Sequence, residues 1–229
     1  MKKTKLTTCL IAAGVLVAFA GLSMPVWAEI PKELKALVDA HPNAPAGSVT
    51  RIKKASQAER GGNGVARPPG LGYSTRQVVT TEITTIRDLV KHINNKAPAE
   101  PVQLEVAVQT TQPGLRYLGQ WVRDPYTTSL FFEEGNRLVM LNLENFKAHG
   151  SRLFIFDENQ NAKVGATPAA LGLRQQGARG LWVLDWIVPG DERLATLWVE
   201  DMLDAKGTPS RRPEAITALA EALLALKSK

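Results

Sequence analysis

Residues 180–188, Gly-Leu-Trp-Val-Leu-Asp-Trp-Ile-Val, decide the predicted fold, because they are apolar at almost every position. A strand covered on one face alternates apolar and polar residues, whereas a strand covered on both faces is apolar throughout. The stretch is therefore predicted to be a central strand of a sheet with a layer on each face. On this strand Asp185 shares a face with Leu181, Val183 and Ile187, so its carboxylate points into an apolar layer.

The sequence around this strand alternates between strand-like and helix-like patterns. Helices are expected where Pro, Thr or Asp stands at the start of an apolar stripe with helical spacing. The predicted strands are 77–83, 102–109, 129–132, 137–142, 153–156 and 162–165, and the predicted helices are 85–93, 113–124, 167–176, 191–207 and 213–226. Such alternation favours an α/β fold: one three-layer or thioredoxin-like domain over residues 77–207, with a mixed sheet.

Residues 1–28 have the layout of a secretory signal peptide. Three lysines among the first five residues precede an apolar core at 9–22, and Val26-Trp27-Ala28 forms a cleavage site before Glu29. The core is too short for an ordinary membrane-spanning helix. We therefore expect a chain that is cleaved between Ala28 and Glu29, does not span a membrane afterwards, and lies in a bacterial periplasm or outside the cell.

The remaining segments flank the domain. Residues 29–41 are predicted to form a short amphipathic helix, 42–76 a flexible basic linker, and 208–229 a C-terminal amphipathic helix. The linker is rich in Pro and Gly, and its part from 46 to 76 holds six basic residues against one acidic residue. It has no aromatic anchors there until Tyr73, so we expect at most weak contact with anionic surfaces.

The net charge of +6 belongs to the signal peptide and this linker, and the rest of the chain is mildly acidic. The basic composition therefore does not predict nucleic acid as a partner, and export argues against it as well. The single cysteine, Cys9, leaves with the signal peptide. The processed chain consequently has no disulfide and no thiol chemistry of its own.

Asp185 is the first candidate for a catalytic residue, and Asp157 is the second. Burial raises the pKa of a carboxyl group, which is how an enzyme prepares a general acid. Asp185 also lies towards the carboxyl end of its strand, where open α/β sheets place their sites. The structural alternative, which we favour, is an acid that pairs with an arginine or accepts backbone N–H bonds.

Trp182, Trp186 and Trp198 are predicted to form one cluster. Aromatic side chains of this kind line grooves that bind sugars or peptides, but each also buries a large apolar area in a core. We favour the core.

No cofactor and no metal site is predicted. His41, His92 and His149 are far apart, and phosphate-binding and nucleophile-elbow motifs are absent from the sequence. Residues 157–161 begin like a calcium loop, but Ala162 and Pro168 stand where that loop requires Gly and Glu.

Residues 106–113, Val-Ala-Val-Gln-Thr-Thr-Gln-Pro, run from an apolar strand through small polar residues into a Pro-started helix with Leu115 and Leu118. This layout resembles the opening of the thioredoxin-like periplasmic proteins of conjugative DNA transfer, the TrbC-type pilus-assembly family. Residues 153–165 resemble the strand–turn–strand hairpin of the same fold. No proline precedes Leu153 where a thioredoxin fold has its cis-proline. The resemblance implies an envelope assembly component rather than an oxidoreductase.

The sequence thus favours a secreted, non-enzymatic protein that binds other envelope proteins, as an assembly component of a secretion or conjugation apparatus does. Two alternatives stay open. One is a periplasmic hydrolase or lyase that uses carboxylates, and the other is a small-ligand-binding protein with a tryptophan-lined pocket.

Overall fold

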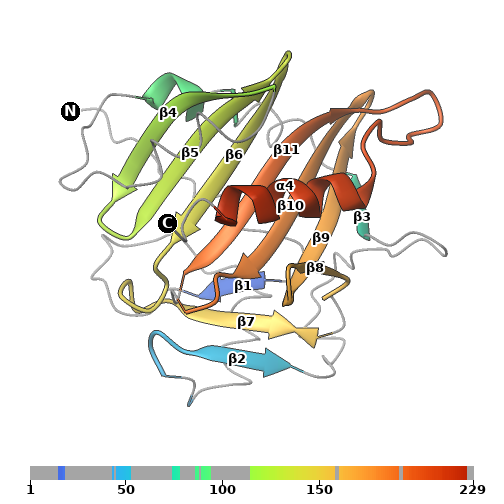
Figure 1. Ribbon diagram of the computed structural model, residues 1–229. Coiled ribbons are helices and arrows are strands. Elements are labelled where there is room, and N and C mark those ends of the chain that lie inside the picture. Colours follow the sequence, from blue (N-terminus) through green and yellow to red (C-terminus); the bar gives the residue numbers. More distant parts are fainter. Residues whose placement is uncertain are drawn as a thin grey trace, which may run out of the picture.

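Two β-sheets organise the computed structural model (Figure 1). The structure describes residues 15–18, 43, 45–52, 74–77, 86–87, 89–93, 114–157, 160–190 and 193–225. The main sheet contains β3 (Ser74–Gln77), β4 (Leu115–Asp124), β5 (Thr127–Glu134), β6 (Arg137–Glu144), β8 (Ala162–Val164), β9 (Thr167–Gln176), β10 (Arg179–Ile187) and β11 (Leu194–Met202). The small sheet contains β1 (Val15–Ala18), β2 (Val49–Ile52) and β7 (Arg152–Phe156).

The strands of the main sheet follow the order β3-β9-β10-β11-β6-β5-β4, and β8 pairs with β9 outside this path. All of its described pairings are antiparallel except the one between β3 and β9. The small sheet has the order β1-β7-β2, in which β1 is antiparallel and β2 parallel to β7. β10 lies between β9 and β11, which confirms that residues 180–188 form a central strand.

The fold is mainly β, so the predicted α/β class and the thioredoxin-like domain are wrong. The predicted helices at 113–124, 167–176 and 191–207 are replaced by β4, β9 and β11. In β11 every residue from Leu194 to Asp201 is buried, because both faces of this strand are covered. A strand covered on both faces loses its alternation of polar and apolar residues, and chance spacings within it then imitate a helical stripe.

Other predicted elements agree with the structure. A hairpin joins β5 to β6 through Gly135-Asn136, with Gly135 at a φ of 63°. The C-terminal helix is α4 (Pro213–Ala225). Ile86, Arg87 and Leu89 are helical and lead into the 3-10 turn η1 (Val90–His92), as expected for 85–93.

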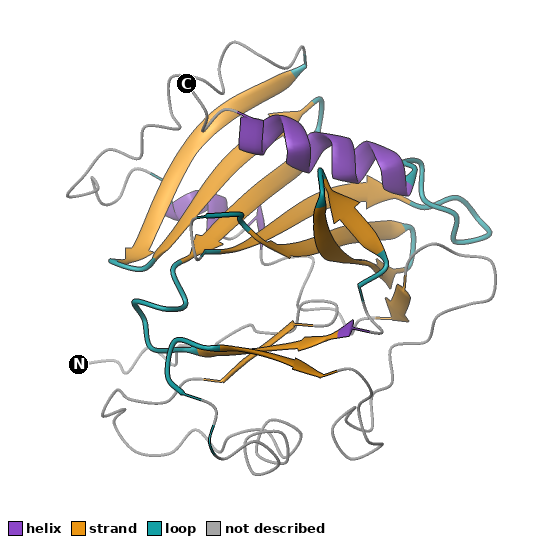
Figure 2. Ribbon diagram, turned by 60° about the horizontal axis from the view of Figure 1, so that its bottom comes forward, coloured by secondary structure: helices purple, strands orange, loops and turns teal. Residues whose placement is uncertain are grey.

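The two faces of the main sheet are covered by different elements (Figure 2). On one face, here the helix face, α4 buries Ile216, Leu219, Ala220 and Leu223 in a large apolar core. On the opposite face, Ile86 and neighbouring apolar residues pack over one end of the sheet. The small sheet packs over the other end through Leu153 and Ile155, which contact Leu194 and Phe146.

The remaining predictions concern the hairpin at 153–165 and the segments that precede residue 110. β7 and β8 belong to different sheets, so the predicted thioredoxin-like hairpin at 153–165 is wrong. β1 lies within the predicted signal peptide, and β2 and β3 lie within the predicted linker. The predicted elements at 29–41, 78–83 and 102–109 lie outside the described residues.

Candidate functional site

A row of polar side chains crosses the opposite face of the main sheet. The strand register places Asp185 of β10 opposite Thr196 of β11, Thr196 opposite Asn142 of β6, and Asn142 opposite Ser129 of β5. Asp185, Thr196 and Ser129 are buried and Asn142 is half-buried. Thr196 Oγ1 donates to Asp185 Oδ1 at 2.7 Å, and Ser129 Oγ donates to Asn142 Oδ1 at 2.9 Å. We call these four residues the polar row.

Asp185 is the least satisfied member of the polar row. Asp185 is only 1% exposed, and its Oδ2 has no hydrogen-bond partner among the described residues. Burial raises the pKa of Asp185 to about 7, although the hydrogen bond from Thr196 and the charge of Arg174 both act to lower it. A carboxyl group with this pKa holds its proton over much of the range in which ordinary aspartates are ionised.

Asp185 lies in the wall of a small cavity where the two sheets meet. Residues of the small sheet, Arg51 and Ile155, form one side, and residues of β9, β10 and β11 form the other. The cavity volume is about 30 Å³. That is room for one or two water molecules, whereas sites for small-molecule ligands enclose about 300–1,000 Å³.

Asp157, the second predicted site residue, lies on the side of the small sheet. Its Oδ1 is 3.3 Å from Nη1 of Arg51, and the same Nη1 donates to Gln160 Oε1 at 3.2 Å. Arg51 and Gln160 line the cavity together with Asp185, whereas Asp157 is not part of the cavity wall. Arg51 therefore lines the cavity beside Asp185 and also forms a partly exposed ion pair with Asp157.

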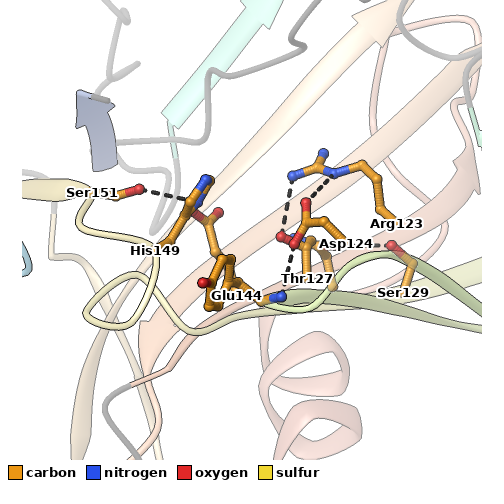
Figure 3. Close-up of polar contacts among 9 residues, drawn as sticks. Arg123, Asp124, Thr127, Ser129, Glu144, His149 and Ser151 are labelled. Atoms are coloured by element: carbon orange, nitrogen blue, oxygen red, sulfur yellow. Dashed lines mark hydrogen bonds and ion pairs between the residues drawn. The ribbon is translucent and has the colours of Figure 1, made fainter. Parts of the chain in front are cut away.

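A second polar cluster surrounds His149, in the connection from β6 to β7 (Figure 3). His149 Nδ1 lies 3.5 Å from Oε1 of Glu144 and 3.3 Å from Oγ of Ser151, and its ring stacks on Tyr126 at 5.3 Å. Glu144 and Ser151 are buried. Sequence reasoning missed this cluster because residues 144–151 match no known motif, and because Tyr126 comes near His149 only through the pairing of β5 with β6.

The set of Glu144, His149 and Ser151 resembles a catalytic triad in composition but not in geometry. In a triad, the acid and the nucleophile contact different ring nitrogens, so that a proton can pass across the imidazole. Here both partners approach the same nitrogen, Nδ1. The cluster therefore fixes the connection between the two sheets and does not activate Ser151 as a nucleophile.

The three tryptophans do not form one cluster. Trp182 and Trp186 belong to the core of the helix face, and Trp198 lies on the opposite face beneath the guanidinium of Arg174, 5.4 Å from the ring centroid. Trp182 Nε1 donates to Oδ2 of the buried Asp201 at 3.0 Å. The tryptophans are core residues of two separate layers.

The described residues contain no group of three or more metal-ligating side chains, and no helix among them is long and apolar enough to cross a membrane. A comparison of this chain with protein-family models, with characterised proteins and with solved structures finds no match.

Proposed function

We propose that this chain is exported to the periplasm of a bacterium, where it binds other envelope proteins without catalysing a reaction. The finer proposal is an assembly component of a secretion or conjugation apparatus. The layout of residues 1–28 supports export. The described part of the main sheet ends in β3 and β4, and strand edges are a common means of protein recognition.

The observation that carries the proposal is the enclosure of Asp185. This residue is the best candidate for an acid or base in the described part of the chain, and it is 1% exposed beside a cavity of about 30 Å³. A substrate of ordinary size needs about ten times that volume. We therefore assign Asp185 to the contact between the sheets and recognition to the outer surface.

The experiment combines location with complex formation. The native protein should be recovered from the periplasm with Glu29 at its N-terminus, and chemical cross-linking of living cells should join it to other envelope proteins. An Asp185→Asn variant should give the same cross-linked species as the wild type. A protein that keeps its initiator methionine in the cytosol contradicts the proposal.

A carboxylate-dependent hydrolase or lyase is the second candidate, favoured by one observation. The pKa of Asp185, raised by burial to about 7, suits a group that donates and accepts protons near neutrality. Such an enzyme requires that the sheets separate to admit a substrate. If Asp185→Asn abolishes the function of the protein in the cell while its fold and its cross-linked species stay unchanged, this candidate is favoured over the first.

A further inference from the structure

The small sheet contains a strand that the proposed export removes. β1 pairs with β7 in antiparallel register, and the pairs are Val15–Ile155, Leu16–Phe154, Val17–Leu153 and Ala18–Arg152. All four β1 residues lie within residues 1–28. Among the described strands, cleavage between Ala28 and Glu29 leaves β7 paired with β2 alone.

β7 has anchors that do not depend on β1. Leu153 is fully buried and Ile155 is 3% exposed, and both pack against Leu194 and Phe146. The N–H of Leu153 donates to the carbonyl of Ser48 at 3.0 Å. These contacts are made within residues 29–229, so the processed chain retains β7 in place, and no other described strand pairs with the edge that β1 occupied.

The β7 edge has fewer of the features that discourage strand pairing than the β4 edge of the main sheet. Natural edge strands avoid unwanted pairing through bulges, charged residues or short length. β4 has two irregularities in its register, between Tyr117 and Gly119 and between Val122 and Asp124, and it carries three charged side chains. β7 is a shorter strand of five residues and begins with the charged Arg152, but it then carries Leu153-Phe154-Ile155-Phe156 without interruption, and its register with β1 is regular.

We propose that the edge of β7 is, in the processed protein, a docking site for an extended apolar segment of another envelope protein. The segment adds to β7 as an antiparallel strand and takes the place of β1. This inference rests on the proposed export and names the surface that binds the partner. β1 itself, Val-Leu-Val-Ala, shows the direction, the minimum length and the apolar character of a segment that fits.

The energetics favour an occupant. A sheet of two strands is marginal in water, and a third strand adds a row of backbone hydrogen bonds and apolar contacts. The peptide groups on the open edge of β7 lose their partners when β1 leaves, and an added strand satisfies them again.

Disulfide trapping in a fixed register tests the proposal. The processed chain has no cysteine, so Phe154→Cys supplies a single thiol. The probe is a synthetic peptide of residues 12–19, Ala-Ala-Gly-Val-Leu-Val-Ala-Phe, with lysines added for solubility and with Leu16→Cys. The register places this cysteine opposite position 154. The matched control peptide carries Val17→Cys instead, which pairs with Leu153 and presents its thiol on the other face.

We expect the Leu16→Cys peptide to form the mixed disulfide several-fold faster than the control peptide under mild oxidation. Equal rates for the two peptides would overturn the proposal. Should Phe154→Cys fail to fold, amide exchange of the wild-type chain 29–229 replaces it. The unmodified peptide should then slow exchange at β7 and leave β10 unchanged, and unchanged exchange at β7 would overturn the proposal.

Two further outcomes separate this proposal from its premise. If the cell-derived protein starts at Met1, export fails and the docking site fails with it. If the protein starts at Glu29 but gives equal disulfide rates, only the docking site fails. A processed protein that dimerises through β7 and is not dissociated by the peptide assigns the edge to a second copy, which also overturns the proposal.

Discussion

The two faces of the main sheet are made by the same strands and yet carry different chemistry. Leu184 and Leu197 point to the helix face, where α4 completes a continuous apolar core. Their neighbours Asp185 and Thr196 point to the opposite face, where they form part of the polar row. The helix face therefore supplies stability mainly through apolar burial beneath α4. The opposite face holds the group whose charge state changes near neutrality.

Shortening a buried side chain on the helix face should have the largest effect on the free energy of unfolding. Leu197 is fully buried in the core beneath α4, and Leu197→Ala leaves a cavity there. We expect the free energy of unfolding to fall by about 2–5 kcal/mol, measured by chemical denaturation. Met202 lies on the same strand with 52% exposure, and Met202→Ala should change the free energy by less than about 0.5 kcal/mol. Equal effects of the two substitutions would contradict the described packing.

The opposite face should make stability depend on pH. Because the folded pKa of Asp185 is raised from 3.8 to about 7, the folded chain keeps a proton that the unfolded chain has released between these values. The contribution of Asp185 is therefore fully present below pH 3.8 and is lost as the pH rises to about 7. The slope reaches about 1.4 kcal/mol per pH unit.

Asp185→Asn removes this contribution, because the amide does not titrate. Denaturation of both proteins at several pH values between 4 and 8 should show that wild type loses stability relative to the variant as the pH rises. Parallel curves for the two proteins would mean that Asp185 does not hold its proton in the fold.

Thr196→Val should have a smaller effect, which depends on pH in the opposite sense. The substitution removes the hydrogen bond to Asp185 Oδ1 and nearly preserves the shape of the side chain. We expect a loss of about 1–2 kcal/mol at pH 8, where the carboxylate is ionised, and a smaller loss at pH 5. A loss that does not change with pH would show that the hydrogen bond does not act on the ionised form.

Loss of the ion pair between Arg51 and Asp157 should have the smallest effect on the free energy of unfolding. Arg51 and Asp157 are partly exposed, with side chains 51% and 37% accessible, and exposed pairs contribute between zero and about 1 kcal/mol. Asp157→Asn should therefore change the free energy of unfolding by less than about 1 kcal/mol, measured by chemical denaturation. A loss as large as that of Leu197→Ala would contradict the partly exposed position of this ion pair.

The sequence predicted the elements whose pattern depends on local chemistry. The central strand at 180–188, the turn at Gly135-Asn136 and the amphipathic helix at 213–226 all agree with the structure. The burial of Asp185 also follows from its neighbours Leu181, Val183 and Ile187. These predictions hold because each depends on periodicity or turn chemistry within a short segment.

The predicted α/β fold class is wrong because tertiary contacts changed the periodicity of several strands. In β4, the irregularity between Tyr117 and Gly119 shifts the alternation, so that Leu115 faces the helix face while Leu118 and Trp121 face the other. The resulting spacing imitates a helical stripe. The polar row joins residues from different strands, and their proximity depends on register that no single segment encodes.

Titration of the Asp185 side-chain carboxyl by carbon-13 NMR tests the central claim most directly. The wild-type protein, labelled at the carboxyl carbons and assigned with Asp185→Asn, should show this resonance shifting with a midpoint near pH 7. That result would place a protonated carboxyl in the closed interface between the sheets. A midpoint near pH 4 would mean that Asp185 is solvated, and it would contradict the enclosure on which the proposed function depends.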